Sequence, residues 1–330
     1  MSTPTFHEEW VSRSRDNEER VAASPLLARG ADLDWVETPH DARVAVVIGM
    51  ASGFPTQGTS LLQAEIPPGW HTGRHVHGEE AIFVRSGSGF AVIGERRYDF
   101  RPGTTIHVPY MAPHQLVNTG EQAVTYLTAS TIDLDLFVRL GRYEQLSDKG
   151  AGNDALAARY PAEEFQFAPD GRRIALHQEE MIDEYARRRE EARVHGHHHG
   201  ATGHTHGAIW VLMGGSESPS TATNGFRASA VAITNIFEEV PHSSSHRHSH
   251  TEAMLYALDG SGYSEIDGAR YDWVAGDAVY VPPRMTVHEH FNESSSRTRT
   301  LRIEFGIRYF YEALWEGYHK IELREEAMAR

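Results

Sequence analysis

Histidine is the side chain whose number and spacing in this sequence could do chemistry, because the chain has 21 histidines and no cysteine. Without cysteine, a transition metal must be held by nitrogen and oxygen ligands. Two histidine pairs have one residue between their members, His75 with His77 and His248 with His250. Residues i and i+2 of a β-strand point to the same face, so each pair would direct two imidazoles at one point.

A third histidine follows each pair near a proline-containing turn, His114 in the first half and His288 in the second. Three neutral imidazoles suit Fe, Mn, Zn, Cu or Ni and leave coordination positions open for substrate and for oxygen or water. Open positions indicate catalysis rather than a structural metal. The sequence therefore predicts two metal centres with six histidine ligands: His75, His77, His114, His248, His250 and His288.

The two histidine sets belong to an internal repeat. Residues 65–113 align with residues 238–286 at a constant offset of 173 without a gap, and a one-residue insertion then brings His114 onto His288. Such self-similarity indicates a duplicated unit. In the second half His246 and His248 also form a pair, so the ligand register there has two solutions. The repeat favours His248 and His250, and His246 is kept as the substitute.

The elements that must position these histidines are predicted to be short strands. Residues of β type separated by Gly, Pro and Asp predict four strands in each copy. These are residues 80–84, 90–93, 105–108 and 116–118, then 254–258, 263–266, 278–281 and 288–291. Short strands with regular turns indicate an antiparallel sandwich or barrel. Helical periodicity outside the repeats predicts helices at residues 8–23, about 175–194, and 309–329.

The repeated residues resemble the cupin superfamily, whose motifs are Gly-x5-His-x-His-x3-4-Glu-x6-Gly and Gly-x5-Pro-x-Gly-x2-His-x3-Asn. Gly69, the first histidine pair and Glu80 fit the first motif, with Glu80 one residue closer than usual, and Ala253 stands where Glu80 aligns. The resemblance implies an all-β chain of two cupin (double-stranded β-helix or jelly-roll) domains with peripheral helices. Its expected segments are a helical extension (1–45), the N-terminal cupin (46–135), a helical linker with a His-rich loop at 195–206 (136–207), the C-terminal cupin (208–307) and a helix (308–330).

The resemblance also implies roles for individual residues. Glu80, or its neighbour Glu79, would complete a site of three histidines and one glutamate, as in oxalate decarboxylases, oxalate oxidases and quercetinase-type dioxygenases. The second half is similar to the gentisate, salicylate and hydroxynaphthoate dioxygenases, which use Fe(II) held by three histidines. His288-Glu289-His290 matches the second motif of those enzymes, which makes His290 a candidate acid or base. Glu80, in the first half, is the other candidate catalytic residue. Three arginines could anchor a substrate carboxylate: Arg247, Arg284 and Arg302.

The leading interpretation is an Fe(II)-dependent dioxygenase that uses O2 to cleave a hydroxylated aromatic acid or a related small molecule. Mn(II), Zn(II), Ni(II) and Cu(II) would also suit the ligands. The alternatives are a Mn-dependent oxalate decarboxylase or oxidase and a non-catalytic bicupin that binds a small molecule. A formal charge of −15 argues against nucleic acid as a partner. We expect no membrane segment, a cytoplasmic location and a homodimer or higher homo-oligomer.

Overall fold

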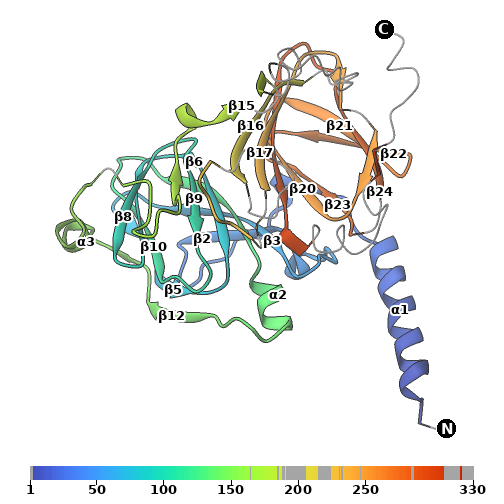
Figure 1. Ribbon diagram of the computed structural model, residues 1–330, viewed down its shortest axis with the longest axis horizontal. Helices are drawn as coiled ribbons and strands as arrows, with labels where there is room; N and C mark the ends of the chain where they lie inside the picture. Colours follow the sequence, from blue (N-terminus) through green and yellow to red (C-terminus); the bar gives the residue numbers. More distant parts are fainter. Residues whose placement is uncertain are drawn as a thin grey trace.

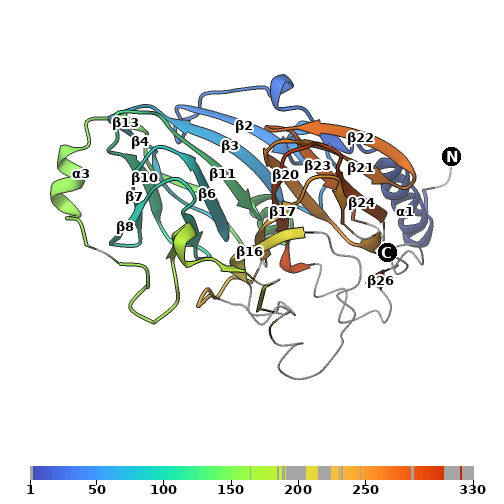
Figure 2. The same ribbon diagram turned by 90° about the horizontal axis from the view of Figure 1, so that it is seen from above.

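Two β-barrels lie side by side and make up most of the molecule (Figure 1). The computed structural model describes residues 3–163, 165–183, 186–187, 190, 206–214, 224–229, 231, 233–245, 247–283, 286–307 and 320–321. Seen from above, the sheets of both barrels run in one broad layer across the molecule, and helix α1 (Phe6–Ala22) lies beside the C-terminal barrel (Figure 2).

The N-terminal barrel is built from two antiparallel sheets. One has the order β14-β9-β6-β11-β3-β2. Its strands are β2 (Arg43–Ile48), β3 (Ser60–Ile66), β6 (Glu80–Ser86), β9 (Thr105–Val108), β11 (Val124–Ser130) and β14 (Ala175–Leu176). The other sheet contains β4 (Trp70–His71), β5 (Arg74–Val76), β7 (Gly89–Ile93), β8 (Arg96–Phe100), β10 (His114–Asn118), β12 (Glu144–Ser147) and β13 (Gly150–Ala151).

The C-terminal barrel repeats this plan. Its first sheet has the order β1-β23-β20-β25-β17-β16-β15. Its strands are β1 (Leu27–Ala28), β15 (Ile182–Asp183), β16 (His206–Gly214), β17 (Ile233–Glu239), β20 (Ala253–Asp259), β23 (Ala278–Val281) and β25 (Thr298–Glu304). The second sheet contains β18 (Ser243–Ser244), β19 (His248–His250), β21 (Ser261–Ile266), β22 (Ala269–Val274), β24 (Thr286–Asn292) and β26 (Lys320–Ile321). All the strands predicted from the repeat are thus confirmed.

Alternation along the central strands separates two kinds of apolar core. On β11 the side chains of Leu127 and Ala129 face the C-terminal barrel, where they join a cluster with Leu301 and Ile303 of β25. Tyr126 and Thr128, the alternate residues, line a cavity inside the N-terminal barrel. The two barrels therefore pack sheet against sheet, and the inner faces are left to form the sites.

One short strand, β1, ties the barrels to each other, whereas β14 extends the sheet of the barrel that it follows. β1 adds to the C-terminal barrel by pairing with β23, although it precedes the N-terminal barrel in sequence. β14 follows that barrel and pairs with β9. Helix α1 begins with a capping box, in which Thr5 and Glu8 exchange hydrogen bonds between side chain and backbone. Its predicted position is confirmed.

The other helices are short, and two helix predictions need correction. They are α2 (Ile132–Phe137), α3 (Asp154–Arg159) and the 3-10 turns η1 (Gly30–Asp32), η2 (Met50–Ser52) and η3 (Gln178–Glu180). Residues 175–183, predicted helical, form β14, η3 and β15, because pairing with β9 and β16 outweighs local helix propensity. Residues 186, 187 and 190 are helical. The histidine-rich residues 195–205 lie outside the described residues, as does most of 309–329, of which residues 320–321 form β26.

Candidate metal centres

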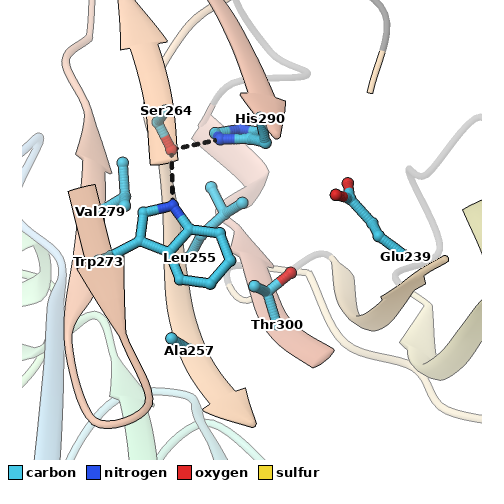
Figure 3. Close-up of a pocket in the computed structure, with 8 residues that line it drawn as sticks. All are labelled: Glu239, Leu255, Ala257, Ser264, Trp273, Val279, His290 and Thr300. Carbon is cyan, nitrogen blue, oxygen red and sulfur yellow. Dashed lines mark hydrogen bonds between the residues drawn. The ribbon is translucent and has the colours of Figure 1, made fainter. Parts of the chain in front are cut away.

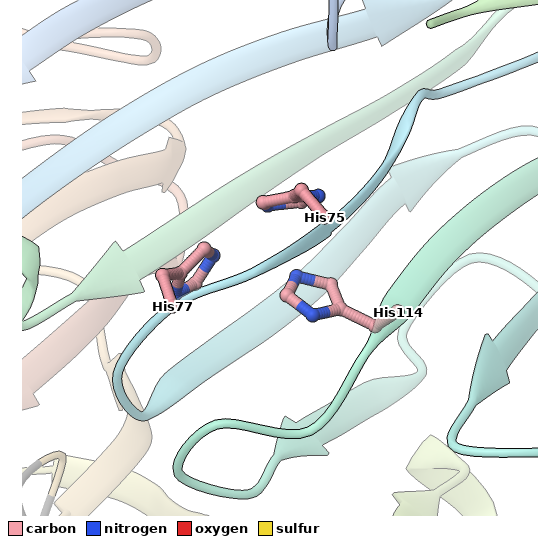
Figure 4. A group of neighbouring side chains, drawn as sticks. All are labelled: His75, His77 and His114. Atoms are coloured by element: carbon pink, nitrogen blue, oxygen red, sulfur yellow. The ribbon is translucent and has the colours of Figure 1, made fainter. Parts of the chain in front are cut away.

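The N-terminal centre consists of His75, His77 and His114 (Figure 4). His75 is the middle residue of β5, His77 follows two residues later, and His114 begins β10 directly opposite His75. The ring centroids of His75 and His114 lie 4.1 Å apart, and those of His77 and His114 lie 4.8 Å apart. One nitrogen from each ring lies within 4.8 Å of the other two, so the predicted set converges on one point.

The C-terminal centre repeats this arrangement with His248, His250 and His288. His248 on β19 pairs with His288 on β24, and their ring centroids are 4.2 Å apart. Nε2 of His250 lies 3.1 Å from Nε2 of His288. The structure therefore brings together the set that the repeat favours. His246, the substitute ligand, lies outside the described residues.

Backbone carbonyls hold the rings in both centres. Nδ1 of His77 faces the Gly78 carbonyl at 3.0 Å, and Nδ1 of His114 faces the Ala112 carbonyl at 2.9 Å. The equivalent contacts join His250 to Thr251 and His288 to Thr286. A proton on Nδ1, donated to a carbonyl, leaves Nε2 unprotonated and free to coordinate a metal. The duplication has thus preserved the contacts behind the ligands as well as the ligands.

Burial keeps the imidazoles of His75 and His77 neutral. It lowers the pKa of His75 far below its usual range, with the neighbouring His114 adding to the effect. Burial likewise lowers the pKa of His77 to about 4, even though the charge of Glu80 acts in the opposite direction. Neutral imidazole is the form that binds metals, so little free energy is needed to deprotonate this centre near neutral pH.

Glu80 is the fourth candidate ligand of the N-terminal centre. Its Oε2 lies 3.3 Å from His114 Nε2 and 3.6 Å from His77 Nε2, and its Oε1 accepts a hydrogen bond from the Thr128 hydroxyl. Burial alone would raise the pKa of Glu80, but His77, His114 and Thr128 hold it at about 2. The carboxylate is therefore charged and directed at the histidines. The C-terminal barrel has Ala253 at this position.

Glu79, the alternative to Glu80, points the other way. Its carboxylate accepts hydrogen bonds from the backbone N–H of Ser229 and of Val231 and lies 2.7 Å from Nε2 of His107. Adjacent strand residues face opposite sides of a sheet, so only one of the two glutamates can reach the metal centre. Glu79 belongs to the contact between the barrels, and its interpretation as a ligand is wrong.

A cavity of about 100 Å³ opens beside the N-terminal centre. Its wall includes His40 and Asp41, from the segment before β2, and Tyr143, from the segment before β12. The His40 ring lies 3.7 Å from the His75 ring, centroid to centroid, and the Tyr143 ring stacks near His77 at 5.9 Å. Sequence reasoning missed all three, because they lie outside the repeat and carry no motif spacing.

His290 lies inside the C-terminal barrel on the same face of β24 as His288, as predicted from their spacing. Its Nδ1 is 2.8 Å from the Ser264 hydroxyl, which also accepts the indole N–H of Trp273 (Figure 3). The space lined by His290 and Trp273 measures only about 10 Å³, which is room for about one water molecule. The aromatic ring of Trp273 occupies the position of Phe100 in the first repeat.

Two of the three candidate arginines lie in the described part of the chain. Arg302 lies on β25, where alternation places it on the same inward face as the cavity residue Thr300. It pairs with the buried Glu304 and lies over the Phe237 ring at 5.2 Å. Arg247 immediately precedes β19, and Arg284 lies outside the described residues.

The donor sets fit a divalent transition metal. In the N-terminal centre His114 Nε2 is buried and makes no well-formed hydrogen bond within the described part of the chain. A buried polar atom without a partner is costly, and a metal ion that accepts its lone pair would remove that cost. Imidazole nitrogens with one carboxylate oxygen suit Fe, Mn, Zn, Ni or Cu.

A family model of the cupin domain matches the chain twice, at residues 62–130 and 236–304. Each match contains one histidine triad on one barrel. The chain is a bicupin. An uncharacterized protein of Methanocaldococcus jannaschii is 30% identical to the bicupin over 73 residues, which is 22% of this chain. The bicupin spans 58% of that curated relative.

Solved structures with the same fold include two kinds of enzyme. Salicylate 1,2-dioxygenase from Pseudaminobacter salicylatoxidans matches 98% of this chain and 99% of its own, with a TM-score of 0.61 and 13% identity. A mutant of Bacillus subtilis oxalate decarboxylase matches 85% of this chain and 77% of its own, with a TM-score of 0.59 and 14% identity. These likenesses establish the bicupin architecture, and at such low identity they establish the fold alone.

Proposed function

We propose that this bicupin is a metal-dependent dioxygenase whose N-terminal cupin is the catalytic centre. The proposal rests chiefly on one observation, the opening of His75, His77, His114 and Glu80 into a cavity of about 100 Å³. In the described part of the C-terminal barrel, the space that His290 lines measures about 10 Å³, and none of the three histidines lines it. A centre that transforms a substrate must hold it, so the N-terminal cupin is the better candidate.

The metal that we propose is Fe(II), which when bound supplies redox chemistry with O2 that these side chains lack. The chain's own residues orient and shield the reactants. Glu80 and the three imidazoles hold the ion, and the Thr128 hydroxyl fixes the Glu80 carboxylate. Leu62, Ile82 and other apolar residues line the rest of the cavity and exclude water. The substrate in this proposal is a small hydroxylated molecule.

Ring cleavage of a hydroxylated aromatic acid is the finer form of the proposal. It would use His290 as acid or base and Arg302 as the carboxylate anchor, both in the C-terminal cupin. The space beside His290 would have to enlarge to admit an aromatic ring, with Trp273 moving aside. We therefore prefer the N-terminal centre as the catalytic site and keep ring cleavage in the C-terminal cupin as the second form of the proposal. The expected homo-oligomer also remains a proposal.

Metal content and oxygen uptake test the proposal together. Protein purified without oxygen should carry iron at about one to two equivalents per chain. His114→Ala should remove the metal of the N-terminal centre and His288→Ala that of the C-terminal centre, because each loses one of three imidazoles. Oxygen uptake with a panel of phenols, enols and hydroxyketones should disappear in His114→Ala and persist in His288→Ala. Uptake that depends on His288 alone would contradict the choice of centre.

Glu80 favours a second candidate, a manganese-dependent decarboxylase or oxidase of the oxalate type. A glutamate beside three histidines is the ligand set that the resemblance to the oxalate enzymes implies. This candidate would be favoured if manganese-loaded protein released CO2 from oxalate and iron-loaded protein consumed no oxygen with the phenols and enols of the panel. Protein that retains no transition metal would count against both enzymes.

A further inference from the structure

The charges that line the N-terminal cavity restrict what it can bind. Two carboxyl groups face it, Glu80 beside the histidines and Asp41 across from them. None of the described residues that line it is a lysine or an arginine. The other polar groups are hydroxyls and the imidazole of His40, and the remaining wall is apolar.

Two basic residues border this part of the fold, and both are engaged elsewhere. Lys149 donates to the backbone carbonyl of Asp41 at 2.9 Å, and its other partner is the carboxylate of Glu37. Arg74 precedes His75, but its guanidinium reaches Glu95 at 2.9 Å and the Gly94 carbonyl at 2.6 Å. Neither cation is directed into the cavity.

The second cupin has a cation at the position that corresponds to Thr128 of the N-terminal cavity. Thr128 on β11 pairs with Ile82 of β6, and Arg302 on β25 pairs with Leu255 of β20 at the equivalent register. The duplicated fold thus places a hydroxyl in one barrel where it places a guanidinium in the other. The described lining of the N-terminal cavity thus has no cation because of its own residues, since the fold can accommodate one.

A carboxylate substrate would therefore enter a buried site with no lysine or arginine among its described lining residues. Burying an ion without a partner costs several kcal/mol, and two nearby carboxyl groups add repulsion. Burial raises the pKa of Asp41 in the metal-free protein, but a divalent ion bound nearby lowers it again and favours the ionised carboxylate. The charges of Glu80 and Asp41 then offset those of the ion, so the metal does not require an anionic substrate. A hydroxyl or ketone group, by contrast, can bind the metal through oxygen and donate to Asp41.

We propose that the N-terminal centre takes a small uncharged substrate bearing a hydroxyl next to a carbonyl or a second hydroxyl, with Asp41 accepting a hydrogen bond from it. This inference rests on the proposed function in one respect, that the N-terminal cupin is where the substrate binds. It deepens that function by separating this cavity from one that would select a carboxylate substrate.

Equilibrium binding without oxygen tests the charge selection. The protein is the His288→Ala variant loaded with Co(II), so that the metal reports on the N-terminal centre. Hydroxyacetone and glycolate are matched in size and differ in charge, and catechol and salicylate form a second pair. Calorimetry and the Co(II) absorption spectrum should show the uncharged member of each pair bound at least about tenfold more tightly, a difference of about 1.4 kcal/mol.

Two variants and a control sharpen the test. Thr128→Arg places in this cavity the cation of the second cupin and should reverse the preference between hydroxyacetone and glycolate. Asp41→Asn removes one carboxyl group without changing its shape and should raise glycolate affinity several-fold. Thr125→Arg introduces the same charge on the face of β11 that turns away from the cavity, at the partly exposed end of the strand where Thr125 bonds Ser86, and should leave the preference unchanged.

Glycolate and salicylate binding to the Co(II)-loaded protein as tightly as their uncharged partners would overturn the inference. So would the absence of binding by every probe at a centre that holds its metal. The outcome is independent of turnover, because oxygen is excluded. Iron-loaded protein that binds hydroxyacetone selectively but consumes no oxygen would contradict the dioxygenase and leave the substrate class standing.

Discussion

At the scale of single residues, Asp41 combines deep burial with a carboxyl group in the N-terminal cavity. Its Oδ1 accepts a hydrogen bond from Tyr126 at 3.0 Å. Burial raises the pKa of Asp41 from 3.8 to about 7, and the Tyr126 hydroxyl only partly opposes this. A buried carboxyl group is often functional, because fold stability alone would favour an apolar residue in its place.

Asp41 should make the stability of the metal-free protein depend on pH. Its pKa is raised on folding, so its contribution is complete below about pH 4 and is lost as the pH rises to about 7. Between pH 5 and pH 8 the wild type should lose about 3 kcal/mol of unfolding free energy relative to Asp41→Asn, which cannot titrate. Urea unfolding at several pH values measures this difference. Parallel curves for the two proteins would show that Asp41 is already ionised at pH 5.

At the scale of elements, β1 is the clearest case of one half of the chain completing the other. The turn after β1 is held by Asp277, whose carboxylate accepts from Arg29 at 2.8 Å and from the Gly30 N–H at 2.9 Å. The same carboxylate accepts from the Val274 N–H at 3.1 Å. A single buried side chain therefore fixes both β1 and the turn between β22 and β23.

Asp277→Ala should destabilise the protein by about 1–3 kcal/mol, because it leaves the backbone N–H groups of Gly30 and Val274 without their acceptor in a partly buried turn. Thermal or urea unfolding measures the change. Asp272→Ala is the matched control, since Asp272 is an exposed carboxylate that pairs with Arg270 on the same strand, β22. Equal stability of the two variants would mean that β1 contributes nothing to the C-terminal barrel.

The elements also show why sequence predicts some features and not others. The strands and the two histidine clusters were predictable, because alternation and a gap-free repeat are signals that local sequence carries. Glu80 was predictable from its place in a motif. The choice between Glu80 and Glu79, however, depends on which face of β6 turns inward. His40 and Asp41 reach the cavity through tertiary folding alone. Residues 175–183 have a helical pattern and become strands because β9 and β16 offer them partners.

At the scale of the whole molecule, two glutamates form reciprocal contacts between the barrels. Glu79 of the N-terminal barrel accepts from the loop before β17, and Glu252 of the C-terminal barrel accepts from the Gln57 N–H and the Thr59 hydroxyl before β3. These glutamates are equivalent in the repeat, as are their partners His107 and Tyr280. The duplication thus created the joint between the barrels as well as the barrels.

Glu79→Ala should weaken this joint without removing the metal ligands. Burial alone would raise the pKa of Glu79, but its hydrogen bonds to His107, Val231 and Ser229 lower it, so the charged carboxylate is the stabilised form. Its loss leaves several buried donors without an acceptor and should cost about 3 kcal/mol or more. Because the joint links two cores, we expect urea unfolding to change from one transition toward two.

The control for this prediction is Glu65→Ala, which removes a partly exposed carboxylate that pairs with Arg43 on the outer edge of the N-terminal barrel. It should unfold as the wild type does. A metal-binding measurement distinguishes the contact between the barrels from the metal centre, because Glu79 and Glu80 are adjacent but point to opposite sides of the sheet. Loss of N-terminal metal in Glu79→Ala at full folding would mean that the joint also positions Glu80, whereas retained metal with split unfolding would place the two glutamates in separate roles.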